Sequence, residues 1–266
     1  MKKLQDIAAE TLSRIRERSP LVLSLTNSVV QPLTANLLLA VGATPAMLND
    51  ASECADMIEA CGNALLVNLG TLTREQADAM RVATDTANAR GVPWVLDPVA
   101  VGLLKFRTEF ARELLAKTPT VIRGNGAEIL ALAGYAAKTR GPESTCGSEA
   151  AAEAARELAR GCGAAVLVTG AVDYATDGAG TLACANGHPM LTRVTGAGCS
   201  MGALTAACAA VADSPLEAAA AAAVLTGVAG EIAFENSGAP GTFAVKLLDA
   251  FYEMTPELVR SRTKAV

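Results

Sequence analysis

The sequence has little histidine and no paired cysteine spacing, and both shortages restrict the chemistry open to it. Its one histidine, His188, excludes a catalytic site built on several imidazoles, and the cysteines show no metal-ligand spacing with it. The seven cysteines include no Cys-x-x-Cys pair. An odd number of scattered thiols is typical of a protein in a reducing compartment, not of a disulfide scaffold.

The sequence also lacks basic blocks, a signal peptide and a good membrane span. Its net charge of −5 disfavours nucleic acid and anionic membranes as partners, since both favour a basic patch. Lys2, Lys3 and Asp6 stand where a signal peptide needs an apolar core, so we expect an unexported, cytoplasmic protein. Residues 217–230 are apolar, but they are too few and too rich in alanine for a span. They predict a buried core helix.

What the sequence does contain is a regular alternation of helical and strand patterns. The chain has 266 residues, of which 51% are hydrophobic, enough for a large core. Short apolar runs predict strands at 21–25, 64–67, 94–96, 120–122 and 165–168. Fully apolar runs are typical of strands covered on both faces. We therefore expect an α/β fold with a mostly parallel central sheet and helices on both faces. No linker or repeat divides the chain, which favours one domain over 1–266.

The ends of the chain carry further patterns. Apolar residues at helical spacing predict a helix from Leu4 to Ile15. Between Asp173 and Arg193, the dipeptide Asn186-Gly187 separates two strand-like runs and predicts a β-hairpin at one edge of the sheet. Three helices are expected after it, over about 198–211, 215–235 and 241–254.

A glycine-rich turn at 195–203 leads into an alanine-rich segment that predicts a buried helix. Gly196, Ala197 and Gly198 would let the first amides of that helix point at one anion, with the positive end of the helix dipole behind them. Cys199 stands at the mouth of this anion hole. The alternative is that the glycines only allow close packing and that Cys199 is a buried apolar residue.

Polar residues follow the predicted strands in step. Since ligands collect at the carboxyl ends of parallel strands, these residues favour one shared cleft over a series of independent helix caps. They are Thr26, Asn27, Asn68, Asp97, Arg123, Asn125, Glu128, Thr169 and Gly170.

This set suits phosphoryl transfer. Asp97 and Glu128 are hard oxygen donors of the kind that bind Mg²⁺. Arg123 can neutralise phosphate charge with a forked set of donors. Phosphoryl transfer needs little beyond position and charge neutralisation. The sequence has no GxxxxGK[ST], and no GxGxxG follows an early strand, so neither a P-loop nor a Rossmann dinucleotide site is expected.

These motifs carry a family resemblance. Residues 125–128 resemble the NxxE motif of the ribokinase-like superfamily, and 195–199 resemble its GAGD signature, with Cys199 in place of the usual aspartate base. The cysteine variant is similar to that of the hydroxyethylthiazole kinases. So are the segments 25–27, 34–36, 42–47, 96–99 and 123–125, and the resemblance runs from about 20 to 255. The stretch 100–104 departs from the glycine-richer form common in the family.

The resemblance implies a ribokinase-like three-layer sandwich and an enzyme of thiamine biosynthesis or salvage. It would use ATP and Mg²⁺ to phosphorylate the hydroxyl of 4-methyl-5-(2-hydroxyethyl)thiazole, as a homotrimer with the substrate pocket at the subunit interface. By the same resemblance, Arg123 and Thr169 would bind ATP, Asp97 and Glu128 would organise the metal, and Met47, Gly196 and Asn27 would hold the thiazole.

The role of Cys199 stays open between a general base and a well-shaped neighbour of the thiazole. As a base it must be a thiolate, which a helix N-terminus favours. Three other functions compete: a pyrimidine or sugar kinase of the same fold, an ATP- or ADP-dependent dehydratase, and a thiol acyltransferase with Cys199 as nucleophile. The cysteine itself counts against the first, and the lack of a second histidine counts against the last. A purely structural or binding protein would not need such a cleft.

Overall fold

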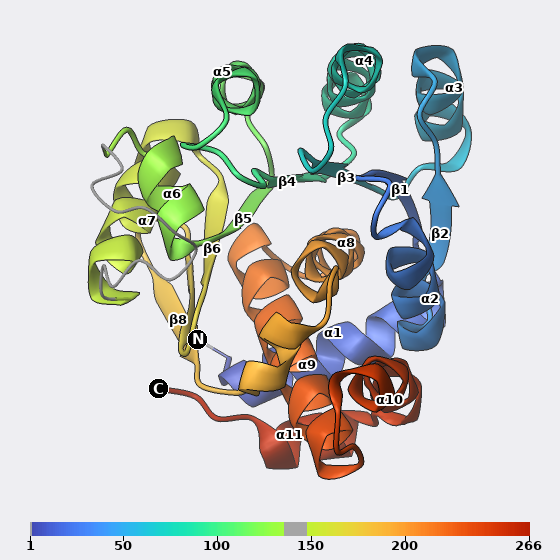
Figure 1. Ribbon diagram of the computed structural model, residues 1–266, viewed down its shortest axis with the longest axis vertical. Coiled ribbons are helices and arrows are strands. Elements are labelled where there is room, and N and C mark those ends of the chain that lie inside the picture. Colours follow the sequence, from blue (N-terminus) through green and yellow to red (C-terminus); the bar gives the residue numbers. More distant parts are fainter. Residues whose placement is uncertain (1, 136–147) are drawn as a thin grey trace.

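One eight-stranded sheet organises the computed structural model, which describes residues 2–135 and 148–266 (Figure 1). The strand order is β2-β1-β3-β4-β5-β6-β7-β8. The pairs from β2 to β6 are parallel, and β7 and β8 add an antiparallel hairpin. The strands are β1 (Leu21–Leu25), β2 (Thr44–Met47), β3 (Ala64–Asn68), β4 (Trp94–Asp97), β5 (Val121–Asn125), β6 (Ala165–Thr169), β7 (Asp173–Thr176) and β8 (Thr181–Cys184).

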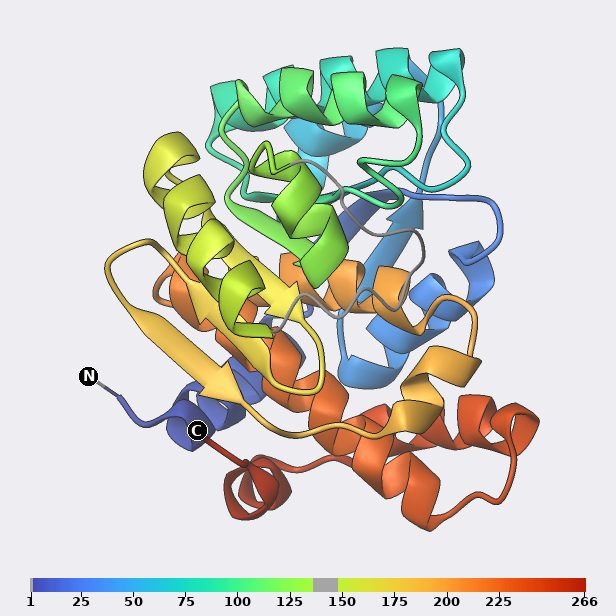
Figure 2. The same cartoon turned by 60° about the vertical axis from the view of Figure 1, so that its left-hand side comes forward.

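Helices cover both faces of this sheet (Figures 1 and 2). The core residues place α3 to α7 on one face and α1, α2, α8, α9, α10 and α11 on the other. The helices are α1 (Leu4–Arg18), α2 (Gln31–Val41), α3 (Ala51–Cys61), α4 (Arg74–Arg90), α5 (Lys105–Leu115), α6 (Gly126–Leu132), α7 (Ser148–Cys162), α8 (Ala197–Ala209), α9 (Pro215–Glu235), α10 (Pro240–Glu253) and α11 (Pro256–Arg262), with a 3-10 helix at Pro189–Arg193. The three-layer α/β prediction is confirmed.

The strands alternate between two hydrophobic cores. Val22, Leu66 and Val95 pack with α8 and α9, whereas Leu23, Leu65 and their equivalents on the other strands pack with α3 to α7. Because both faces are covered, apolar residues occupy successive positions. This explains the continuous apolar runs of the sequence. The alternation of side chains also determines which face of the sheet each residue at a strand end lies on.

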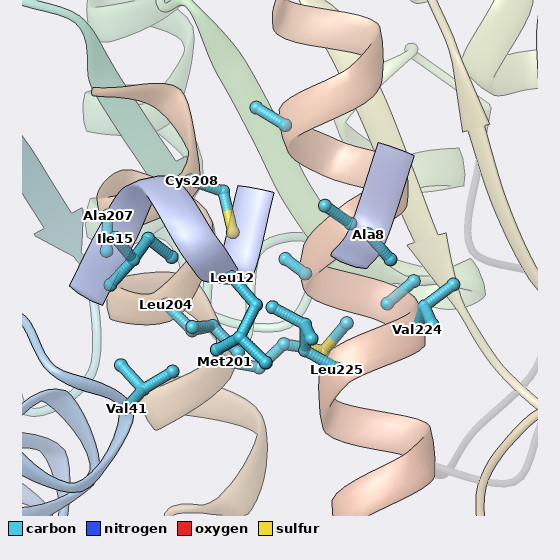
Figure 3. Close-up of a cluster of buried hydrophobic side chains, with 14 of the residues drawn as sticks. Ala8, Leu12, Ile15, Val41, Met201, Leu204, Ala207, Cys208, Val224 and Leu225 are labelled. Atoms are coloured by element: carbon cyan, nitrogen blue, oxygen red, sulfur yellow. The ribbon is translucent and has the colours of Figure 1, made fainter. Parts of the chain in front are cut away.

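The core beneath the sheet is built around α8 and α9 (Figure 3). Leu12 and Ile15 of α1 meet Leu204 of α8 and Leu225 of α9, and all four are fully buried. Helix α9 is long and apolar enough to cross a membrane by length and composition, yet 83% of its apolar window is buried inside the protein. The sequence prediction of a core helix at 217–230 is confirmed.

The predicted hairpin exists, but its turn is not Asn186-Gly187. The chain reverses between β7 and β8 at Asp177–Gly180, where Asp177 Oδ1 accepts hydrogen bonds from the amides of Ala179 (2.9 Å) and Gly180 (2.7 Å). Asn186 lies beyond β8. Its buried side chain donates to Glu231 Oε1 and to the carbonyl of Arg262, so it fixes the C-terminal segment instead.

Two elements escaped sequence reasoning, and four strands were predicted to end too early, β5 by three residues and β3, β4 and β6 by one. Edge strand β2 is half-exposed and contains Pro45, so it shows neither an apolar run nor a clean alternation. Helix α11 is too short for a helical pattern to stand out. Strand β5 continues through Asn125, so Arg123 lies within it and not after it.

Candidate active site

Four polar side chains lie at or near the carboxyl ends of neighbouring strands, on the face that α8 covers. Asn68, Asp97 and Thr169 are the last residues of β3, β4 and β6, and Arg123 lies in β5. The residue before each of them packs into the core on the other face, so alternation turns these four toward α8. A Cβ at Gly202 of α8 would lie 3.1 Å from Asp97 Oδ2, which confirms that this helix passes directly over the strand ends.

Hydrogen bonds join these residues into what we call the strand-end network: Cys199, Asn27, Asn68, Asp97, Arg123 and Thr169. The Asn27 amide group donates to Cys199 Sγ (3.4 Å) and to Asn68 Oδ1 (3.0 Å). The Asn68 amide in turn donates to Asp97 Oδ2 at 2.6 Å. The network therefore connects the thiol to the carboxylate through two side-chain amides.

Arg123 extends the network to β6. Its Nη1 lies 3.8 Å from Asp97 Oδ1, and its Nη2 donates to Thr169 Oγ1 at 3.1 Å. The guanidinium is mostly buried, and its Nε has no hydrogen-bond partner within the described chain. A buried cation with donors to spare is suited to an anionic ligand such as phosphate. The structure thus brings together Arg123 and Thr169, the two residues expected to bind ATP.

Asp97 is the most strongly perturbed acid of the network. It is fully buried, and burial raises its pKa to about 7, although Arg123 and the Asn68 hydrogen bond pull the pKa down. The charge of Glu128 raises it further. Its Oδ1 has no hydrogen-bond partner among the described residues. A buried carboxylate oxygen that is open on one side can accept a cation or a proton.

The N-terminus of α8 lies against Arg123 and carries free amides. Gly196 has φ of 92°, and a Cβ there would lie 2.8 Å from Val30 Cγ1, so both backbone and space favour glycine. A Cβ at Gly198 would lie 3.2 Å from both terminal nitrogens of Arg123. The Ala197 amide donates weakly to Val194 at 3.4 Å, whereas those of Gly198 and Cys199 have no acceptor in the described chain.

The Cys199 thiol is half-buried at this helix end. Burial raises its pKa above the ordinary value, and the charge of Asp97 raises it further, whereas the amides of Asn68 and Asn27 and the charge of Arg123 act in the opposite direction. The raised pKa argues against a thiolate at neutral pH, although the position at a helix N-terminus favours one. The thiol is neutral at neutral pH because burial and the charge of Asp97 outweigh the effects of Asn68, Asn27 and Arg123.

Glu128 lies at the edge of the network and orders two pieces of backbone. Its Oε1 accepts from the Ala100 amide and its Oε2 from the Asn125 amide, each at 3.0 Å. The Asn125 side chain completes a capping box that starts α6. Ala100 has φ of 62°, a left-handed conformation that glycine adopts more easily. The loop after β4 thus contains a non-glycine residue in a conformation that favours glycine.

Met47 lies away from the strand-end network. It is half-buried at the end of the edge strand β2 and pairs with Ser24 of β1. The described residues hold no cluster of three or more His, Cys, Asp or Glu side chains suited to a metal ion, so a metal here would depend on the two carboxylates, water and substrate oxygens.

Sequence reasoning missed one residue of the site, Asp173, and gave no role to another, Asn68. Asn68 stands among the strand-end polar residues but receives no role from its position alone. Asp173 begins β7, so the strand-end rule gives no signal for it; its carboxylate accepts from the Gly170 amide at 2.9 Å. Burial raises the pKa of Asp173 to about 6, against the opposing effects of that hydrogen bond and of Arg123.

His188 is not a partner for the thiol. Its ring stacks on Phe234 of α9, with ring centroids 3.5 Å apart, and its Nδ1 accepts from the Met190 amide. A Cys–His pair of the kind that activates a thiol nucleophile is therefore absent from the described residues. This removes the geometric basis for a thiol acyltransferase.

Comparison with known proteins decides the family. A sequence model of the Hydroxyethylthiazole kinase family matches residues 12–257. The chain belongs to the hydroxyethylthiazole kinase family. A curated hydroxyethylthiazole kinase from Akkermansia muciniphila is 61% identical over 261 residues, covering 98% of this chain and 96% of that protein. Another from Kineococcus radiotolerans is 51% identical over 95% of this chain and 92% of its own length.

Solved structures agree with the hydroxyethylthiazole kinase assignment. The hydroxyethylthiazole kinase from Pyrococcus horikoshii superposes with a TM-score of 0.90 at 43% identity, covering 97% of this chain and 98% of that one. An ADP complex of Bacillus subtilis pyridoxal kinase superposes with a TM-score of 0.57 at 18% identity, over 77% of this chain and 88% of its own. The second likeness shows the shared ribokinase-like fold.

Proposed function

We propose that the protein transfers the terminal phosphoryl group of ATP to the hydroxyl of 4-methyl-5-(2-hydroxyethyl)thiazole, in the supply of thiamine phosphate. The observation that carries the proposal is the strand-end network. It connects Cys199 and Asn27 to a buried carboxylate and a cation, Asp97 and Arg123, near the α8 amides that have no acceptor in the described chain. A phosphoryl group between the two halves of the network would face the donors of Arg123 and α8 on one side. On the other side it would face an alcohol held by Cys199 and Asn27.

The basic and amide donors would bind the nucleotide. Arg123 would contact phosphate oxygens, with Thr169 holding its Nη2 in place. The Gly198 and Cys199 amides would stabilise negative charge on the transferring group, together with the neighbouring backbone at Gly196 and Ala197.

Asp97 and Glu128 fit a magnesium ion that keeps several water ligands. Asp97 offers an oxygen without a hydrogen-bond partner among residues 2–135 and 148–266, and Glu128, with one amide on each oxygen, keeps lone pairs for water. When bound there, Mg²⁺ would neutralise charge on the phosphates.

Asn27, Gly196 and Met47 would contact the thiazole. Asn27 lies beside the thiol, and Gly196 packs against Val30 before α2. Met47 stands on an edge strand that is half-exposed in the single chain. From the family resemblance we propose a homotrimer with the pocket completed at the subunit interface, and the half-exposed edge leaves Met47 able to meet a neighbouring subunit. We propose too that residues 1–266 form one kinase domain, which works in the cytoplasm.

Cys199 would act chiefly as a neutral wall of the thiazole pocket. A loose phosphoryl transition state places little demand on prior deprotonation of the alcohol, so a weak base or none suffices. Burial raises the pKa of the thiol, which fits this role better than the role of a general base.

Isothermal titration with Mg·ATP and a panel of small alcohols tests the proposed substrate. The panel contains hydroxyethylthiazole, pyridoxine, a hydroxymethylpyrimidine and a simple sugar. We expect hydroxyethylthiazole to bind most tightly. Preference for any other alcohol would overturn the substrate assignment while leaving a kinase in place.

A further inference from the structure

Asn68 occupies the middle of the strand-end network, and its orientation is fixed from three sides. Its Oδ1 accepts from the backbone amide of Gly70 at 2.9 Å and from the Asn27 side chain at 3.0 Å. A backbone amide can only donate, so the oxygen of Asn68 must face Gly70 and its nitrogen must face Asp97. The side chain is fully buried, so water cannot replace any of these partners.

The side chains on either side of Asn68, those of Asn27 and Asp97, also have fixed partners. Both amide hydrogens of Asn27 are used, one toward Asn68 and one toward Cys199. Asp97 receives the Asn68 amide on Oδ2 and faces Arg123 with Oδ1. Rotation of any one amide would leave a buried donor or acceptor without a partner. The connected side chains therefore move together or not at all.

We propose that Asn68 is a positioning residue that couples binding of the thiazole to binding of the magnesium nucleotide. The proposal rests on the proposed function, because it takes Asn27 and Cys199 as the thiazole side and Asp97 and Arg123 as the nucleotide side. A thiazole that orders Asn27 also orders Asn68, and through it the carboxylate that faces the metal. The second ligand then meets a site already in place, so each ligand tightens the other.

Thiazole affinity, measured by isothermal titration with and without saturating Mg·ADP, tests this coupling. ADP lacks the transferable phosphoryl group, so direct contact between the two ligands is removed. For the wild type, we expect Mg·ADP to tighten thiazole binding by about fivefold or more, and by linkage thiazole should tighten Mg·ADP by the same factor.

Asn68→Asp is the informative variant, because it keeps the acceptor for Gly70 and Asn27 but replaces the neutral amide donor by a second carboxyl group that must share a proton with Asp97. We expect it to lower the coupling factor to about one while both ligands still bind separately. Asn68→Ser, which is too short to reach both neighbours, should do the same and covers the case that the aspartate variant does not fold.

Asn186 provides a matched control. It too is a buried asparagine whose amide donates to a carboxylate, Glu231, but it fixes the C-terminal segment. Asn186→Asp should lower the melting temperature and keep the wild-type coupling factor. A factor of one in a wild type that phosphorylates the thiazole would overturn the proposal, and so would a folded Asn68→Asp with an unchanged factor. A wild type that binds no thiazole under either condition would instead overturn the proposed function.

Discussion

Individual side chains of the site are held in states that differ from their behaviour in water. Asp97 is buried without enough positive charge to keep its pKa at the ordinary value, and Cys199 is half-buried within reach of the charge of that same carboxylate. The surroundings of each group explain its state. Asp97 needs a nearby cation to be fully ionised, and the Cys199 thiol stays neutral. Both features make the ligand-free site ready for a cation and for an apolar ring.

The raised pKa of Asp97 predicts an acidic limb in the pH profile. Protonated Asp97 no longer carries the negative charge that would bind Mg²⁺. We therefore expect kcat/KM for Mg·ATP to fall as the pH drops below about 7. The same shift means that the folded state holds the proton more tightly than the unfolded chain. Stability of the ligand-free protein should therefore decline as the pH rises toward and through about 7.

Asp173→Asn is the control for this limb, because the pKa of Asp173 is also raised, to about 6. The variant should keep the limb near neutral pH. Loss of the limb in this variant, or a wild-type profile that stays flat through neutral pH, would contradict the assignment to Asp97.

Cys199→Ala tests whether the thiol is a base. With a neutral thiol, the variant should keep kcat within about tenfold of the wild type, well short of the ~10²–10⁴-fold loss expected on removing a general base. Its KM for the thiazole should rise, because a soft contact with the ring is lost. Cys199→Asp should keep turnover but bind the thiazole more weakly, since a charge would stand beside the ring. Two equally inactive but folded variants would show instead that the thiol itself takes part in the chemistry.

Among the elements, α8 defines the site by how closely it approaches the sheet. Gly198 lies against Arg123 and Gly202 lies against Asp97 and Leu66, each too close for an unstrained Cβ. The two glycines are four residues apart, so they share one face of the helix. Small residues on that face let the free amides at its N-terminus reach the strand ends.

Gly198→Ala should therefore damage nucleotide binding more than folding. Its Cβ would stand 3.2 Å from the Arg123 nitrogens, so the guanidinium must shift slightly, and KM for ATP should rise, by less than the ~100-fold associated with a 1 Å misplacement. Gly161→Ala in α7 is the control, since no atom from other parts of the described chain lies within 4 Å of its Cβ position. That variant should leave kinetics unchanged and add about 0.5–1 kcal/mol to the free energy of unfolding. Equal kinetic effects in the two variants would refute the close-approach role.

Much of this element-level arrangement could be predicted from the sequence, and the exceptions have physical causes. Apolar runs marked β1, β3, β4 and β6 because strands buried on both faces must be apolar throughout. The hairpin turn was misplaced because Asn186-Gly187 has turn chemistry, whereas the side chain of Asn186 serves a tertiary contact 76 residues away in sequence. The hydrogen-bond partners within the site could not be predicted. Asn68 joins Asn27 to Asp97 because of side-chain directions that no pattern in the sequence specifies.

At the scale of the whole molecule, the C-terminal segment covers the last strand of the sheet. The Ala185 amide donates to the Lys264 carbonyl (2.9 Å) and the Val266 amide to the Ala183 carbonyl (3.2 Å). Lys264 also donates its amide to Asn186 Oδ1 at 2.7 Å. The segment thus occupies hydrogen-bonding positions on β8 that would otherwise form an open edge.

Deleting residues 264–266 should destabilise the fold and promote association. Loss of these hydrogen bonds should lower the free energy of unfolding by about 1–3 kcal/mol, and the opened edge should raise the apparent mass at high protein concentration. Lys264→Ala keeps the backbone and removes only its partly exposed ion pair with Glu231, so its effect should stay below about 1 kcal/mol. Denaturant unfolding and light scattering separate the two cases. A truncated protein with wild-type stability would show that the segment does not protect the edge.

The central claim is that the two halves of the strand-end network bring an alcohol and a phosphoryl group together. Phosphorus NMR of a reaction containing the protein, Mg·ATP and hydroxyethylthiazole measures this directly. We expect one ADP for each phosphate monoester formed, with the new phosphorus signal coupled to the methylene protons beside the former hydroxyl. ADP released without that monoester, or a phosphate group that stays on the enzyme or passes to water, would contradict the proposed reaction.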